Sequence, residues 1–63
     1  MNVYQKAKIN IVEVRKMVND ETYRIWGNKP SWGIGAALQA FNNTCNKLLR
    51  KLDEYSILYP NEQ

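Results

Sequence analysis

Few side chains in this 63-residue sequence could take part in catalysis or bind a metal. The chain has no histidine and a single cysteine, Cys45, so it lacks a plausible zinc ligand set and the second thiol of an internal disulfide. Its six carboxylates show no pairing typical of acid–base work, and no candidate nucleophile stands beside a suitable base. The sequence therefore predicts a protein that is not an enzyme and that uses no metal or cofactor.

Aromatic side chains gather around the one clear break in the sequence, at residues 27–31. Trp26 and Trp32 flank the break, with Tyr23 close by and Lys29 at its centre. One interpretation is that the rings fold over this end of the molecule and plug it. The other is an exposed patch, because such residues dominate protein–protein hot spots. We take Tyr23, Trp26, Lys29 and Trp32 as the candidate partner-binding residues.

Basic residues outnumber acidic ones by nine to six, which gives a net charge of +3. Some of them could form a strip along one side of the molecule. One interpretation is an ordinary solvated helix face. Its positive charge would be partly compensated by Asp53 and Glu54, which follow Arg50 at helical spacing. Alternatively it could contact the phosphates of RNA or DNA. The candidate residues for this second hypothesis are Arg15, Lys16, Lys47, Arg50 and Lys51.

Apolar side chains recur at alternating steps of four and three residues through most of the chain. That spacing places side chains on one stripe of an α-helix, whereas a strand needs a period of two. The stripe in the second half comprises Ile34, Leu38, Phe41, Cys45, Leu48, Leu52, Tyr55 and Tyr59. The stripe in the first half comprises Tyr4, Ala7, Ile11, Val14, Val18 and Ile25. We expect one domain with helices over 2–26 and 32–59, a turn over 27–31 and a frayed tail over 60–63.

The predicted turn contains residues suited to ending one helix and starting the next. Gly27 can adopt the left-handed conformation that ends a helix, Pro30 does not continue one, and Ser31 is the best N-cap candidate. A loop this short makes the helices antiparallel. Matching the two stripes gives six pairs, such as Val18 with Phe41, whose residue numbers add up to about 59. Every pair is apolar or aromatic, so an all-α helical hairpin is predicted.

A second apolar stripe on the first helix indicates that the hairpin does not stand alone. Ile9, Val12, Tyr23 and Trp26 lie away from the first stripe. A chain this short usually needs a disulfide, a metal or a second subunit for stability, and only the subunit remains. We therefore expect a homodimeric four-helix bundle, related to a coiled coil, with Ile9 and Val12 in the dimer interface. The rival is a monomer that docks this stripe on a different protein.

Function follows from these features only as an expectation. The leading hypothesis is a small regulator or inhibitor that binds another protein, a class that includes proteins encoded by phages and mobile elements. The alternatives are a dimeric nucleic-acid-binding protein and a structural or assembly subunit. No run of about eighteen apolar residues suggests a membrane span, and Lys6 and Lys8 interrupt any apolar leader. We expect a cytoplasmic protein, with Cys45 as a buried apolar residue or, alternatively, in a disulfide between two subunits.

Overall fold

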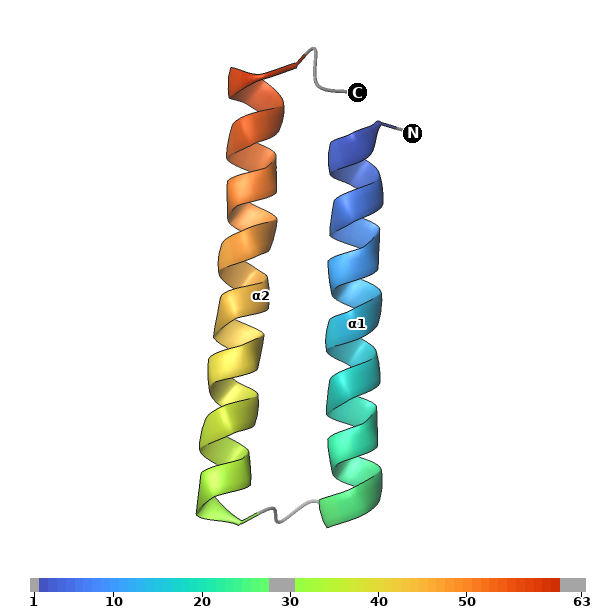
Figure 1. Ribbon diagram of the computed structural model, residues 1–63, viewed down its shortest axis with the longest axis vertical. Coiled ribbons are helices and arrows are strands. Elements are labelled where there is room, and N and C mark those ends of the chain that lie inside the picture. The colour runs from blue at the N-terminus through green and yellow to red at the C-terminus, as the bar shows by residue number, and fades with distance from the viewer. Residues whose placement is uncertain (1, 28–30, 61–63) are drawn as a thin grey trace.

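The chain folds into two long helices that lie side by side (Figure 1). The computed structural model describes residues 2–27 and 31–60, and forms α1 (Val3–Trp26) and α2 (Trp32–Leu58). The helices run antiparallel in a single layer, whose Cα dimensions are 44 × 18 × 10 Å. The described residues contain no strand, which confirms the predicted all-α hairpin. Positions 28–30 of the predicted turn and 61–63 of the predicted tail lie outside the described residues.

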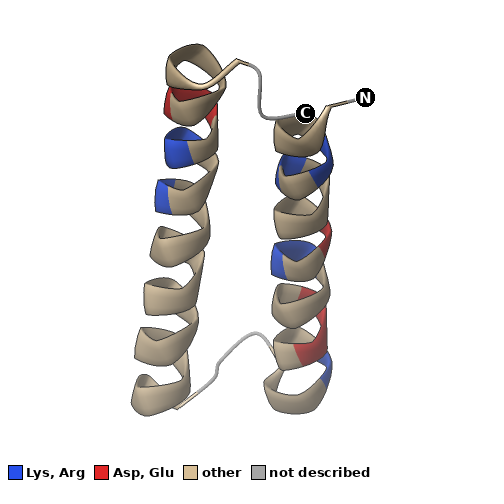
Figure 2. Ribbon diagram, turned by 45° about the horizontal axis from the view of Figure 1, so that its top comes forward, with Lys and Arg blue, Asp and Glu red and all other residues tan. Residues whose placement is uncertain are grey.

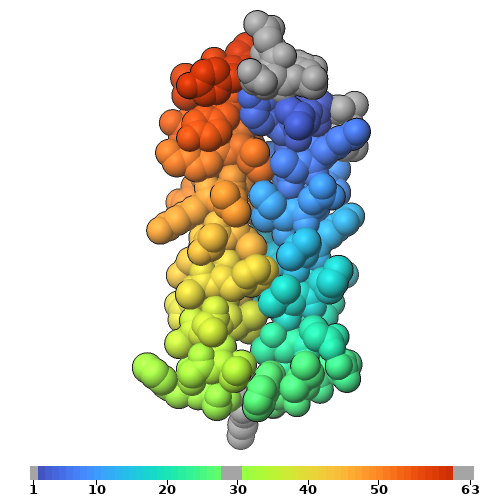
Figure 3. All heavy atoms as spheres, in the orientation of Figure 1, coloured from blue at the N-terminus to red at the C-terminus, as the bar shows by residue number. Residues whose placement is uncertain are grey.

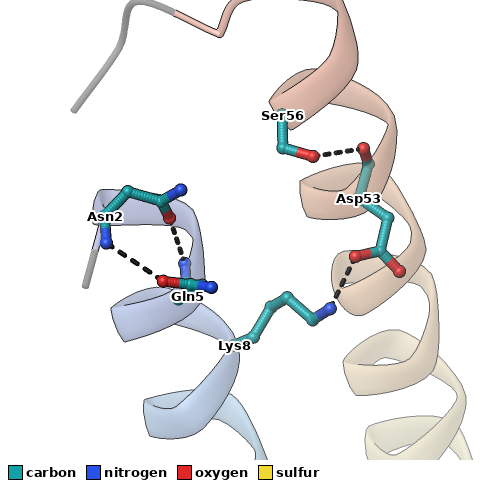
Figure 4. A network of polar contacts seen from close by, with 5 residues as sticks. All are labelled: Asn2, Gln5, Lys8, Asp53 and Ser56. Atoms are coloured by element: carbon teal, nitrogen blue, oxygen red, sulfur yellow. Dashed lines mark hydrogen bonds and ion pairs between the residues drawn. The ribbon is translucent and has the colours of Figure 1, made fainter.

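Side chains at both N-termini explain where the helices begin. The Oδ1 atom of Asn2 accepts a hydrogen bond from the Gln5 amide at 2.9 Å, and Gln5 Oε1 accepts one from the Asn2 amide at 3.2 Å (Figure 4). This reciprocal pair is a capping box, which satisfies two amides that the helix leaves without partners. Ser31 Oγ accepts from the Ile34 amide at 3.3 Å, which confirms Ser31 as the N-cap of α2.

The end of α1 depends on the backbone freedom of one glycine. Gly27 has φ 74° and ψ −162°, and its amide donates to the Tyr23 carbonyl at 2.7 Å. Only glycine adopts this combination of angles readily, because a Cβ atom would clash with its own backbone. The prediction that Gly27 ends the first helix is therefore confirmed.

The contact between the helices buries only part of the predicted stripes. Tyr4 and Cys45 are the only buried residues among those described, with exposed fractions of 9% and 5%. Ile11, Val18 and Leu38 are half-buried. Ala7, Ile34, Phe41 and Leu52 are half-buried as well. Five stripe members are between 41% and 58% exposed, and these are Val14, Ile25, Leu48, Tyr55 and Tyr59. One hairpin therefore covers only one side of the apolar surface that its sequence provides.

The helices meet along a line next to the predicted apolar pairs. The side chains of Arg15 and Asn46 meet across the helices, and each directly follows a member of the predicted pair Val14–Cys45. One residue corresponds to about 100° around a helix. The polar pairs that cross the helices add up to 61, so they lie about two residues from the predicted register and involve the polar neighbours of the predicted apolar pairs. In the space-filling view the helices touch along their length (Figure 3).

Candidate functional site

Three polar pairs connect the helices along one flank of the hairpin, which we call the polar flank. Lys8 Nζ lies 2.6 Å from Asp53 Oδ1 (Figure 4), and Arg15 Nη1 donates to Asn46 Oδ1 at 2.6 Å. The third pair joins Asn19 and Asn42. The residue numbers in each pair add up to 61, so all three pairs share one register. This flank holds the two helices at fixed heights relative to each other.

The amide pair at Asn19 and Asn42 is the most enclosed of these contacts. Asn19 Nδ2 donates to Asn42 Oδ1 at 2.8 Å, and Asn42 Nδ2 donates back to Asn19 Oδ1 at 3.1 Å. Asn19 Nδ2 also donates to the Arg15 carbonyl at 2.6 Å. This pair was not predicted from the sequence. The available signal was that each asparagine directly follows a member of the predicted apolar pair Val18–Phe41.

The opposite flank of the hairpin is an open apolar depression, which we call the apolar groove. Its central part has a volume of about 250 Å³. The part nearer the turn has a volume of about 290 Å³. Phe41 lines both parts, so they adjoin at this ring, and none of the lining residues is charged. The central part is lined by Asn10, Ile11, Val14, Phe41, Cys45 and Leu48. The part near the turn is lined by Val18, Thr22, Trp26, Ile34, Ala37, Leu38 and Phe41.

The predicted aromatic residues near the turn are exposed to different degrees. Trp32 is 90% exposed, so the interpretation that this ring plugs the hairpin end is wrong for Trp32. Tyr23 is 63% exposed, whereas Trp26 is 49% exposed and lines the apolar groove. Lys29 lies outside the described residues. A Cβ atom added at Gly33 would meet no heavy atom within 4 Å, so the surface beside Trp32 is open.

The predicted dimer residues Ile9 and Val12 lie on α1, each with 42% of its surface exposed. Both side chains are therefore accessible to another molecule. Val12 and Val14 are two residues apart, which places them about 200° apart around the helix. Since Val14 lines the apolar groove, Val12 belongs to a different face of α1.

The basic residues of the nucleic-acid hypothesis do not share one environment. Arg15 reaches across the polar flank, whereas Lys47 follows the buried Cys45 by two residues and therefore lies on the outer face of α2. Arg50 and Lys51 lie within one turn of Lys47, and Lys16 is exposed on α1. Basic and acidic residues alternate along α1, while the half of α2 nearest the turn carries no charge (Figure 2).

Two further ion pairs lie within single helices. Lys51 Nζ is 3.3 Å from Glu54 Oε2 and 5.9 Å from the centre of the Tyr55 ring. Arg24 donates to Glu21 Oε1, and this hydrogen bond raises the pKa of the Arg24 guanidinium. All four charged side chains are more than half exposed, so neither pair adds much to stability. They reduce the uncompensated charge on the surface.

Comparisons with known proteins do not assign a role to these features. No protein-family model, curated protein or solved structure matches the chain. Within residues 2–27 and 31–60, no three histidine, cysteine or acidic side chains are placed to hold a metal ion. Neither of the two described helices combines the length and hydrophobicity needed to cross a membrane.

Proposed function

We propose that this protein is a small non-enzymatic regulator or inhibitor that acts by binding another protein, and that it does so as a homodimeric four-helix bundle. The observation that carries the proposal is the exposed apolar surface. Among the described residues, fourteen large apolar side chains are at least 41% exposed, while only two residues are buried. Isolated exposed apolar residues are normal, but apolar residues that gather on one surface, as in the apolar groove, mark interaction surfaces.

The hairpin offers enough surface for two separate contacts. The apolar groove and the face of α1 that carries Ile9 and Val12 lie on different sides of the molecule. A second copy needs one of them, since a two-helix layer encloses too little apolar surface for a stable domain. The turn end, with Trp32 almost fully exposed, supplies an aromatic anchor for a foreign partner.

The experiment is affinity capture from the cells that produce the protein, followed by identification of bound protein and nucleic acid. The test variant is Trp32→Ala, and the control is Ile57→Ala, which removes a 79% exposed side chain at the other end of the hairpin. We expect the wild type and the control to retain the same partner protein. Trp32→Ala should lose it while its circular dichroism spectrum stays helical, because an exposed ring contributes little to folding.

Salt dependence separates this proposal from its alternatives. Binding to RNA or DNA through Lys47, Arg50 and Lys51 should weaken steeply between about 50 and 200 mM salt, because each phosphate contact releases counterions. A contact centred on Trp32 should change little over the same range. Capture of nucleic acid alone, with a steep salt dependence, would overturn the proposal. Growth into particles larger than a dimer would instead favour the structural-subunit alternative.

A further inference from the structure

We infer that the apolar groove, rather than the face carrying Ile9 and Val12, is the surface on which a second copy of this chain packs. The inference rests on the proposed homodimer and adds to it the identity of the interface. In the resulting bundle, the groove of each hairpin covers the groove of the other. The face with Ile9 and Val12 then stays outside the bundle.

The groove is the less polar of the two apolar surfaces. Neither of its parts is lined by a charged side chain, and the two parts adjoin at Phe41. On the other face, Lys16 interrupts the apolar stripe between Val12 and Tyr23. Asn19 also lies between them, and its side chain is hydrogen-bonded in the polar flank. Apolar contact without interruption is what a buried bundle core requires.

The charge of the chain limits which face can meet its own copy. Each copy carries a net charge of +3, so two copies repel each other unless the contact excludes like charges. The groove meets this condition because its lining is entirely uncharged. A contact centred on Lys16 would instead bring the same cation from both copies into the interface. Charge therefore favours the groove for self-association.

The chain exposes more surface than a compact monomer of its mass, and the excess is about what one subunit of a standard dimer buries. A compact monomer of 7.4 kDa is expected to expose about 4,200 Å². This chain exposes 5133 Å². The excess of about 900 Å² is close to the roughly 800 Å² that each partner contributes to a standard interface.

The test compares two valines on the same helix. Val14 lines the groove and is 48% exposed, whereas Val12 is 42% exposed on the other face. In Val14→Glu, a carboxylate would be buried between copies, so the dimer dissociation constant should rise at least about a hundredfold. In Val12→Glu it should stay within about threefold of the wild type. Sedimentation equilibrium, with circular dichroism on the same samples, measures mass and helicity.

Val14→Glu could unfold when it no longer forms the dimer, and a mixing experiment tests the inference in that case. Val14 lies near the middle of α1 (Val3–Trp26) and lines the central part of the groove, so a two-fold axis through that part would bring its two copies close together. An equimolar mixture of Val14→Glu and Val14→Lys should therefore recover twice the 7.4 kDa chain mass. If each charged variant alone loses the dimer, the mass of the mixture tests the inference. A mixture that stays at the mass of a single chain would overturn it.

The remaining outcomes separate the interface from the dimer itself. A wild type that sediments as a single chain at every concentration would overturn both the inference and the proposed homodimer. A wild-type dimer that survives Val14→Glu would overturn the inference and leave the homodimer standing. In that case dissociation of Val12→Glu would assign the interface to the face that carries Ile9 and Val12.

Discussion

The two flanks of the hairpin are built from neighbouring residues of the same helices, yet their chemistry is opposite. On one flank Asn19 and Asn42 join their amides across the helices. On the other, the residues just before them, Val18 and Phe41, line a groove with no charged group. A rotation of about 100° around each helix therefore separates polar groups that find their partners within the chain from apolar side chains that stay uncovered.

This difference shows how a short chain can divide its requirements between two surfaces. Polar pairs contribute little net stability, because the free energy lost when both groups leave water offsets most of the free energy gained from their hydrogen bond. They do penalise a shifted register, since any shift leaves an amide without its partner. The apolar groove supplies stability in proportion to the area that becomes covered. The polar flank thus specifies the hairpin, and the groove provides the surface for association.

The largest effect should come from truncating the side chain that joins both parts of the groove. Phe41→Ala is expected to lower the free energy of unfolding by about 2–4 kcal/mol, because it removes the apolar contacts of a large half-buried ring. Urea unfolding followed by circular dichroism measures the change. Tyr23→Ala is the control, because that ring is 63% exposed and its loss should cost less than about 1 kcal/mol. Equal losses in the two variants would contradict the role given to the groove.

An intermediate effect is expected at the amide pair of the polar flank. Asn42→Ala should lower the free energy of unfolding by about 1–2 kcal/mol, because the Asn19 amide loses a partner in a half-buried site. In the double variant Asn19→Ala/Asn42→Ala, the loss should be smaller than the sum of the two single losses. A double-mutant cycle by urea unfolding measures this coupling. Strictly additive losses would show that the pair does not set the register.

Much of the fold could be predicted because its determinants are local. The four-three spacing of apolar residues requires helices, Gly27 and Ser31 have the chemistry of helix ends, and a short loop makes the helices antiparallel. The capping box at Asn2 and Gln5 was equally local and was overlooked. The side on which the helices meet was not predictable from the stripe alone, because the stripe is wider than the surface one partner helix covers.

The candidate site was less predictable, because it depends on what lies outside the chain. A plug and an exposed patch require the same aromatic residues, and only the 90% exposure of Trp32 separates them. Likewise, apolar residues such as Val14 and Leu48 give the same sequence pattern whether they contact the other helix or another molecule. Both side chains are 48% exposed in the hairpin. The described residues therefore cover only about half of each side chain.

The smallest effect should come from the ion pair at the end of the polar flank. Lys8 and Asp53 are 2.6 Å apart, but their side chains are 40% and 62% exposed, so water screens the attraction. Lys8→Ala should lower the free energy of unfolding by about 0.5 kcal/mol or less, and by less still in 1 M NaCl, where charges are screened within about 3 Å. Urea unfolding at low and high salt measures both values. Lys51→Ala is the control, because its partner Glu54 lies on the same helix. A loss at Lys8 as large as that at Asn42, and insensitive to salt, would mean that the ion pair and not the amide pair fixes the register.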